Sequence, residues 1–218
     1  MIKIFLKRFS LISAYSIAMA FLEAAVVIYL RKLFYPSGFY FPVKNMPSDI
    51  LVVELLREAS TIVMLITVAM MASKKNKERF SYFIYSFGVW DIFYYIWLYL
   101  MIGWPESLLT YDILFLIPVI WVGPVLAPVI VSLTMIVSAI TYILFIEKGY
   151  DIDIKRSSLI LACTGSFIIF LSFIIDLKHI ISVNTPIGYR WWVFNLGEFL
   201  IIAGYFITFK NYFIKRKS

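Results

Sequence analysis

The chain has 218 residues, of which 62% are hydrophobic and only 15% are charged. Soluble domains are roughly half apolar and a quarter charged, whereas the mean hydropathy of this chain is +0.90. Its apolar residues come in blocks of about twenty, the length that a helix needs to cross the hydrocarbon core of a bilayer. This composition excludes a soluble enzyme, a coiled coil and a disordered chain, and it predicts an integral membrane protein.

The scarcity of cysteine and histidine limits the chemistry further. With Cys163 and His179 as the single residues of their kinds, an intramolecular disulfide, a bis-histidine haem and a cysteine-based zinc or iron–sulfur site are excluded. The net charge of +7 falls in short loops, so we expect the lipid bilayer and not a nucleic acid as the partner of the basic residues. We predict no cofactor and no metal centre, and leave room for a cation in a carboxylate cluster.

Taken in chain order, the apolar blocks predict six transmembrane helices in one polytopic domain over residues 1–218. They cover about residues 10–30, 50–72, 80–102, 124–146, 158–176 and 191–209. Fourteen of the 20 Lys and Arg residues lie before the first span, in the second-to-third and fourth-to-fifth loops, and after the last span. The positive-inside rule therefore predicts that both termini are cytoplasmic, and we expect the cytoplasmic membrane of a prokaryote.

The segment before the fourth span breaks the helical pattern. No charged residue occurs between Asp112 and Glu147, a stretch too long for one span. Pro118, Gly123, Pro124 and Pro128 interrupt it, because a proline removes a backbone donor, and we predict that the segment around Pro118 to Pro124 is non-helical or sharply kinked. We expect a proline-broken half-helix over about residues 112–119 that re-enters the outer leaflet before the fourth span. The alternative is one strongly tilted, proline-kinked helix.

Six ionisable residues fall inside the predicted spans, where each costs several kcal/mol unless it is paired, protonated or hydrated. They are Glu23, Glu54, Arg57, Glu58, Asp91 and Glu198. At a rise of about 1.5 Å per residue, four of them lie at a matched depth of about 10–12 Å below the outer surface. These four, Glu23, Arg57, Glu58 and Glu198, are predicted to form one buried cluster, with Asp91 nearer the midplane.

Helical spacing adds neighbours to these charges. Tyr94 and Tyr95 follow Asp91 at i+3 and i+4, and Asn195 precedes Glu198 at i−3, positions that share a helix face. The predicted ligand-binding or proton-linked residues are Glu23, Glu54, Arg57, Glu58, Asp91, Tyr94, Tyr95, Asp112, Trp121, Asn195 and Glu198.

The charges within the spans do not balance. Five carboxylates against the single Arg57 would carry a charge of −4 if all were ionised, so either several are protonated or a cation enters the bundle. The structural alternative is that Arg57 pairs with Glu54 or Glu23 to hold helices together while the other acids stay neutral. We favour an outward-facing acidic and aromatic pocket, since five acids exceed what such pairing needs.

Three functions fit this pattern, and an enzyme is the less favoured kind of protein because no lipid-transferase, serine-protease or zinc-protease motif is present. The first is binding or transport of a small solute or cation. The second is a non-catalytic membrane subunit of a larger complex, and the third a lipid-modifying intramembrane enzyme that uses carboxylates. The six spans, cytoplasmic termini and outer site resemble in architecture the substrate-binding components of energy-coupling-factor transporters. This resemblance implies capture of a small solute, and it includes no diagnostic motif.

Overall fold

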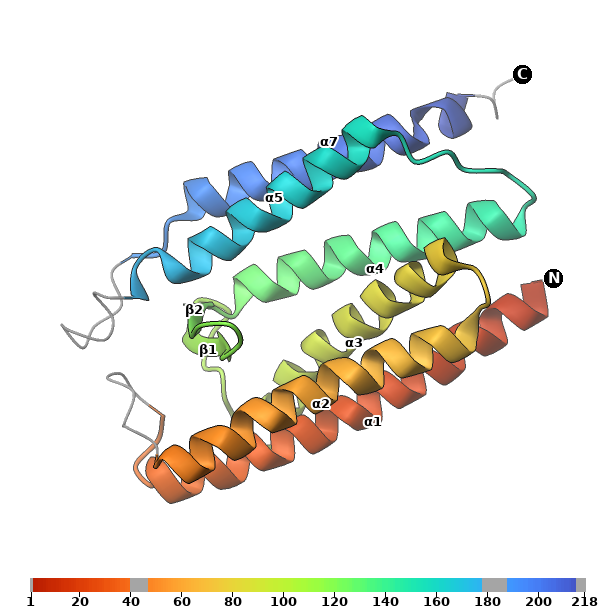
Figure 1. Cartoon of the computed structure of the whole chain (residues 1–218). Helices are drawn as coiled ribbons and strands as arrows, with labels where there is room; N and C mark the ends of the chain where they lie inside the picture. The colour runs from red at the N-terminus through yellow and green to blue at the C-terminus, as the bar shows by residue number, and fades with distance from the viewer. Residues whose placement is uncertain (1, 40–46, 178–187, 215–218) are drawn as a thin grey trace.

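The computed structural model describes residues 2–39, 47–177 and 188–214, and within these ranges it is a helical bundle with one short β-hairpin (Figure 1). The helices are α1 (Ile2–Phe34), α2 (Ser48–Ala72), α3 (Asn76–Ile102), α4 (Leu126–Glu147), α5 (Arg156–Ile174) and α7 (Trp191–Ile214). The strands are β1 (Tyr111–Phe115) and β2 (Trp121–Pro124). Lys44, Lys178, His179 and the basic residues at 215–217 lie outside the described ranges.

Each predicted span coincides with a helix. Five helices of the described residues, all except α2, are long and apolar enough to cross a membrane, which indicates an integral membrane protein. The remaining helix, α2, carries Asp49, Glu54, Arg57 and Glu58 in its first half and lies alongside α1 and α3. The predicted helical character is therefore confirmed, and membrane crossing is indicated for five of the six segments.

The half-helix expected over residues 112–119 is wrong, and so is the single kinked helix. Residues Tyr111–Phe115 and Trp121–Pro124 form antiparallel strands, with Asp112 opposite Gly123 in the ladder. The aromatic and β-branched residues of this segment favour a strand, and a hairpin pairs backbone groups that would otherwise be unsatisfied at membrane depth. The prediction that the segment between Pro118 and Pro124 is non-helical is confirmed, and α4 begins just after it, at Leu126.

Glycine lets two pairs of helices pack backbone to backbone. A Cβ atom added at Gly165 of α5 would lie 2.5 Å from the carbonyl oxygen of Gly197 in α7, and one added at Gly197 would lie 2.7 Å from the carbonyl oxygen of Gly165. Gly88 of α3 stands in the same relation to the carbonyl oxygen of Ser132 in α4, at 2.7 Å. Helices α5 and α7 thus form a tight pair that meets the rest of the bundle through β2 and α4.

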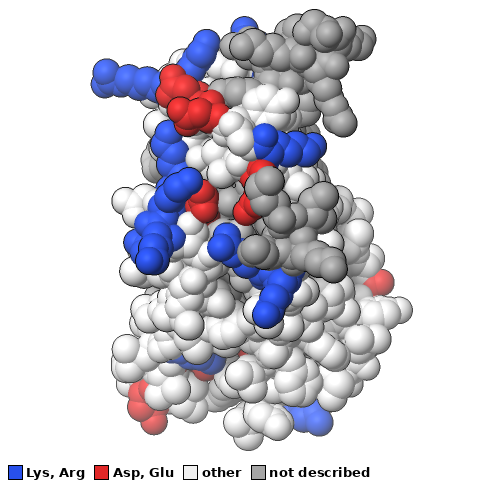
Figure 2. Space-filling view, turned by 90° about the vertical axis from the view of Figure 1, so that its right-hand side faces the viewer, with Lys and Arg blue, Asp and Glu red and all other residues white. Residues whose placement is uncertain are grey.

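The two ends of the bundle differ in charge. The start of α1, the α2–α3 and α4–α5 connections and the end of α7 lie at one end, and the hairpin lies at the other (Figure 1). Figure 2 views the first end, where Lys and Arg side chains gather. A hollow at this end is lined by Arg8, Lys74, Lys75 and Arg79. We call the two ends the basic end and the hairpin end.

Candidate functional site

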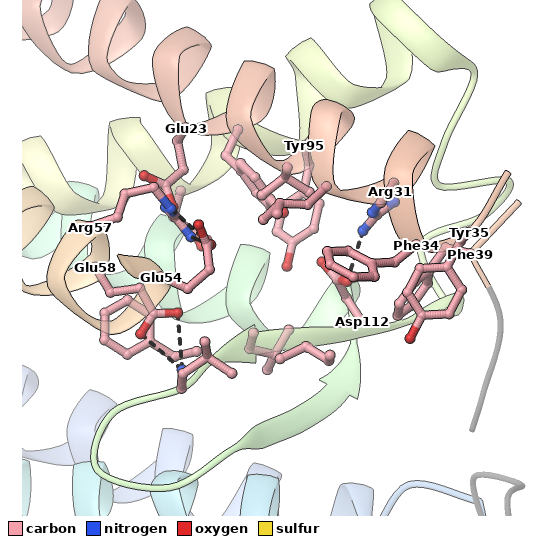
Figure 3. Close-up of a pocket in the computed structure, with 18 of the residues that line it drawn as sticks. Glu23, Arg31, Phe34, Tyr35, Phe39, Glu54, Arg57, Glu58, Tyr95 and Asp112 are labelled. Carbon is pink, nitrogen blue, oxygen red and sulfur yellow. Dashed lines mark hydrogen bonds and ion pairs between the residues drawn. The ribbon is translucent and has the colours of Figure 1, made fainter. Parts of the chain in front are cut away.

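A cavity of about 120 Å³ lies at the hairpin end, between α1, α2, α3 and β1 (Figure 3). Its walls include five carboxylates, two guanidinium groups and seven aromatic side chains. The charged residues are Glu23, Glu54, Glu58, Asp91, Asp112, Arg31 and Arg57, and the aromatic residues are Phe34, Tyr35, Phe39, Trp90, Tyr94, Tyr95 and Phe115. If all seven charged groups were ionised, the wall would carry a net charge of −3.

Arg57 occupies one side of the cavity between two carboxylates, as Figure 3 shows. Its Nε and Nη2 donate to Oε2 of Glu54 at 3.0 and 2.7 Å, and its Nη1 is ion-paired with Oε1 of Glu23. The hydroxyl of Thr61 donates to the other oxygen of Glu23 at 3.1 Å. Arg57 therefore joins α2 to α1, and this group of one cation and two acids keeps an excess of one negative charge.

Glu58 contacts the hairpin. The backbone N–H of Leu116 donates to both of its carboxylate oxygens, at 3.1 and 3.0 Å. Leu116 directly follows β1, where a backbone donor away from water needs a partner. Glu58 thus attaches α2 to the hairpin, and its charge has no ion-pair partner among the described residues.

Arg31 and Asp112 form a second ion pair at the other side of the cavity (Figure 3). The Nη2 of Arg31 lies 3.0 Å from Oδ1 of Asp112. The guanidinium also lies over the rings of Trp104 and Phe39, 3.6 and 4.7 Å from the ring centroids, distances typical of cation–π contacts. Arg31 also lines a second hollow toward the outside of the hairpin end, together with Lys32, so it stands between the two spaces.

The pKa of Asp112 is raised from its ordinary value of 3.8 to about 6. Burial is the main cause, because a low-dielectric surrounding disfavours the charged carboxylate. The positive charge of Arg31 acts in the opposite direction and limits the rise. Asp112 lies in β1, where only 2% of its surface is exposed, and this burial is what disfavours its charged form.

Asp91 lies on α3 and lines the same cavity as the two ion-paired groups. Its Oδ2 accepts a hydrogen bond of 2.8 Å from the hydroxyl of Ser132 in α4, instead of the bond from a neighbouring tyrosine that helical spacing favours. Asp91 and Asp112 are close enough for their charges to interact. Among the described residues, Asp91 has no ion-pair partner.

The cavity brings together eight of the eleven predicted site residues. They are Glu23, Glu54, Arg57, Glu58, Asp91, Tyr94, Tyr95 and Asp112. Trp121, Asn195 and Glu198 are not among the lining residues. Trp121 stacks on Phe173 of α5, with ring centroids 6.0 Å apart, and its ring centroid lies 5.8 Å from that of Phe115, which lines the cavity.

Glu198 lies elsewhere in the bundle, and the prediction that it joins Glu23, Arg57 and Glu58 in one cluster is wrong. It is buried on α7, where its Oε2 accepts a hydrogen bond of 3.1 Å from Thr134 of α4. Its neighbour Asn195 is exposed. Residue counting places Glu198 at the same depth as Glu23, Arg57 and Glu58. Helix α7, however, packs with α5 on the side of α4 that faces away from the cavity (Figure 1).

Sequence reasoning missed several lining residues, of which Arg31 is the most important. The predicted first span ends at residue 30 and excludes Arg31, although Arg31 follows Glu23 by eight residues and Val27 by four, a spacing that places all three on one face of α1. Phe34, Tyr35 and Phe39 continue the same wall beyond the predicted end of the first span. The helical spacing of the polar face of α1 continues past residue 30, where the predicted first span ends.

No family model, curated protein or solved structure matches this chain. The chemistry of the site therefore rests on its own geometry. Over residues 2–39, 47–177 and 188–214, no three His, Cys, Asp or Glu side chains are grouped closely enough to hold a metal ion. What the cavity offers is a surplus of negative charge beside aromatic rings, which suits a soft or organic cation.

Proposed function

We propose that this protein binds a small cationic solute in the cavity at its hairpin end and serves its transport across the membrane. The observation that carries the proposal is the charge imbalance of the cavity wall, with five carboxylates and two arginines. Buried carboxylates without partners are costly in a membrane protein. A cation in the cavity would offset this cost, whereas an anion would add to it.

The proposal includes an orientation. We propose that α2 also crosses the membrane, which makes six spans, and that the basic end faces the cytoplasm. The support is the gathering of Lys and Arg at that end (Figure 2) together with the positive-inside rule. The cavity then opens toward the outside, in the cytoplasmic membrane of a prokaryote.

The test is ligand-dependent thermal stability of the purified protein. Chloride salts of small amines and of Na⁺ and Mg²⁺, together with uncharged polyols and amino acids, are added separately to the wild type and to Val27→Trp. Val27 lines the cavity, so an indole at this position would fill it. A bound ligand at one hundred times its Kd stabilises the folded state by about 2.7 kcal/mol, so the melting temperature should rise by about 5 °C or more.

The expected result is that a cationic solute raises the melting temperature of the wild type and leaves that of Val27→Trp unchanged. Reconstituted vesicles then show uptake of the same radiolabelled solute by the wild type alone. Stabilisation by uncharged solutes only, or equal stabilisation of both proteins, would contradict the proposal.

A further inference from the structure

We propose that the solute is a small alkylammonium ion held by Asp91 and Asp112 among the aromatic residues of α3. This inference rests on the proposed function and gives the ligand a chemical class and the cavity a contact point. Both carboxylates line the cavity, and one comes from α3 and the other from the hairpin.

The first observation is an unused acceptor. Asp112 is 2% exposed, and its Oδ2 is buried without a hydrogen-bond partner among the described residues. The backbone N–H of Ile113 and the hydroxyl of Tyr95 lie close enough to Asp112 to affect its ionisation, but neither makes a hydrogen bond of standard geometry to Oδ2. A buried carboxylate oxygen that accepts no hydrogen bond costs free energy. The N–H or N–CH₃ groups of an ammonium ion would place positive charge against this oxygen.

The second observation is the local charge. Asp91 and Asp112 line the same cavity, and among the described residues the arginine bonded to this pair is Arg31, whose guanidinium donates to Oδ1 of Asp112. When both acids are ionised, at a pH above the raised pKa of Asp112, two acids and one arginine leave one negative charge unbalanced. A ligand with a single positive charge restores neutrality at this point.

The third observation is the aromatic surrounding. Trp90, Tyr94 and Tyr95 flank Asp91 along α3 and line the cavity with it. Trp90 and Tyr94 are stacked, with ring centroids 6.5 Å apart, and Tyr95 meets Tyr94 edge to face at 4.9 Å. Ring faces attract weakly hydrated organic cations, whereas a divalent ion such as Mg²⁺ needs several oxygen ligands.

The size of the cavity limits the ligand. Its volume is about 120 Å³, and a cavity of about 150 Å³ holds one benzene molecule. The ligand therefore has no more non-hydrogen atoms than a small ring compound. Choline and ethanolamine are suitable probes of this class, because the first presents only methyl groups around its charge and the second presents three N–H donors.

The experiment is titration calorimetry on the full-length protein in lipid nanodiscs. The probes are choline, ethanolamine, Na⁺, Mg²⁺ and dimethylbutanol, the uncharged carbon isostere of choline. A charge-assisted contact contributes about 1.5–3 kcal/mol, so choline or ethanolamine should bind at least tenfold more tightly than dimethylbutanol. Tighter binding of choline than of ethanolamine assigns the recognition to the rings, and the reverse order assigns it to the carboxylate oxygens.

The variants locate the contact. Asp112→Asn and Asp91→Asn should each weaken ammonium binding at least tenfold. Asp91→Asn keeps an acceptor for the hydroxyl of Ser132, so it serves as the test if Asp112→Asn does not fold. Glu198→Gln is the matched control, because Glu198 is also buried but lies outside the cavity, and its affinity should equal that of the wild type.

The outcomes separate this inference from the proposed function. If dimethylbutanol or Mg²⁺ binds as tightly as the amines, or if both aspartate variants bind normally, the ammonium class is wrong. In that case loss of binding in Val27→Trp would still support a solute cavity. If no probe binds the wild type, or if Val27→Trp binds like the wild type, the ammonium inference and the cavity function both fail.

Discussion

Glu58 of α2 accepts the backbone N–H of Leu116 on both carboxylate oxygens, at 3.1 and 3.0 Å. A helix side chain therefore completes the hydrogen bonding of the residue that follows β1. This contact explains how a two-stranded hairpin persists inside an apolar bundle, since non-helical backbone at that depth must be satisfied by the protein. It also gives Glu58 a structural role in addition to its contribution to the charge of the cavity.

Removal of this contact should destabilise the protein. We expect Glu58→Ala to lower the free energy of unfolding by about 1–3 kcal/mol, because the N–H of Leu116 loses its partner. Glu58→Gln should lower it less, since the amide oxygen still accepts. Thermal unfolding in detergent, followed by circular dichroism, measures both variants. Equal melting temperatures for the wild type and the alanine variant would show that the contact does not stabilise the hairpin.

Loss of Arg57 should be more costly. We expect Arg57→Leu to lower the free energy of unfolding by about 3–5 kcal/mol, because Glu23 and Glu54 are left buried without their cation. The control is the triple variant that adds Glu23→Gln and Glu54→Gln, in which neither of the two acids bonded to Arg57 keeps a charge. Its melting temperature should recover most of the loss. A single variant as stable as the wild type would indicate that the two acids are neutral in the folded protein.

The glycine contact between α5 and α7 predicts a steric effect. Gly165→Ala places a Cβ atom 2.5 Å from the carbonyl oxygen of Gly197, so the helices must move apart at a cost of about 1–3 kcal/mol. Gly188→Ala is the matched control, because nothing lies within 4 Å of its added Cβ atom. The thermal midpoint should fall for the first variant only. A fall of equal size in both would argue against backbone contact as the cause.

The raised pKa of Asp112 predicts how stability depends on pH. Because its pKa rises from 3.8 in the unfolded chain to about 6 in the folded protein, the folded state keeps a proton that the unfolded state releases. The free energy of unfolding should therefore fall as the pH rises from about 4 to 6, by about 2–3 kcal/mol. Arg31, Asp91 and Tyr95 face this carboxyl group and are present in both proteins. Denaturation of the wild type and Asp112→Asn across this range measures the slope, and equal slopes would contradict the assignment.

The helices could be predicted from the sequence because a span of about twenty apolar residues is a strong and local signal. The hairpin could not, since a short apolar run without clear periodicity fits a strand and a buried half-helix equally well. The choice between a strand and a half-helix depends on contacts with residues that are distant in the sequence. Glu58 lies about sixty residues earlier in the chain than the backbone group it binds, and no local pattern reports such a contact.

The sequence likewise predicts one part of the candidate site and misses another. Depth along a helix follows from residue counting, and it brought Glu23, Arg57 and Glu58 together correctly. The direction in which a helix turns its polar face depends on which neighbours it packs against, and this is where Glu198 was misplaced. Arg31 is missed for a different reason. Helix α1 continues to Phe34, four residues past the predicted end of the span, and Arg31 is the first residue beyond that predicted end.

Two hydrogen bonds between α4 and α7 fix how far these helices are displaced along each other. Thr134 bonds to Glu198 and Thr141 to Tyr205, and each pair is separated by 64 residues. The two helices therefore run parallel with a constant offset, and the bonds recur after seven residues, about 10.5 Å along the axis. A displacement of the α5–α7 pair along α4 by less than this distance would break both bonds. A displacement by the full distance would bring one threonine to the other's partner and leave one residue on each helix unpaired. The two bonds together therefore oppose sliding of the α5–α7 pair along α4.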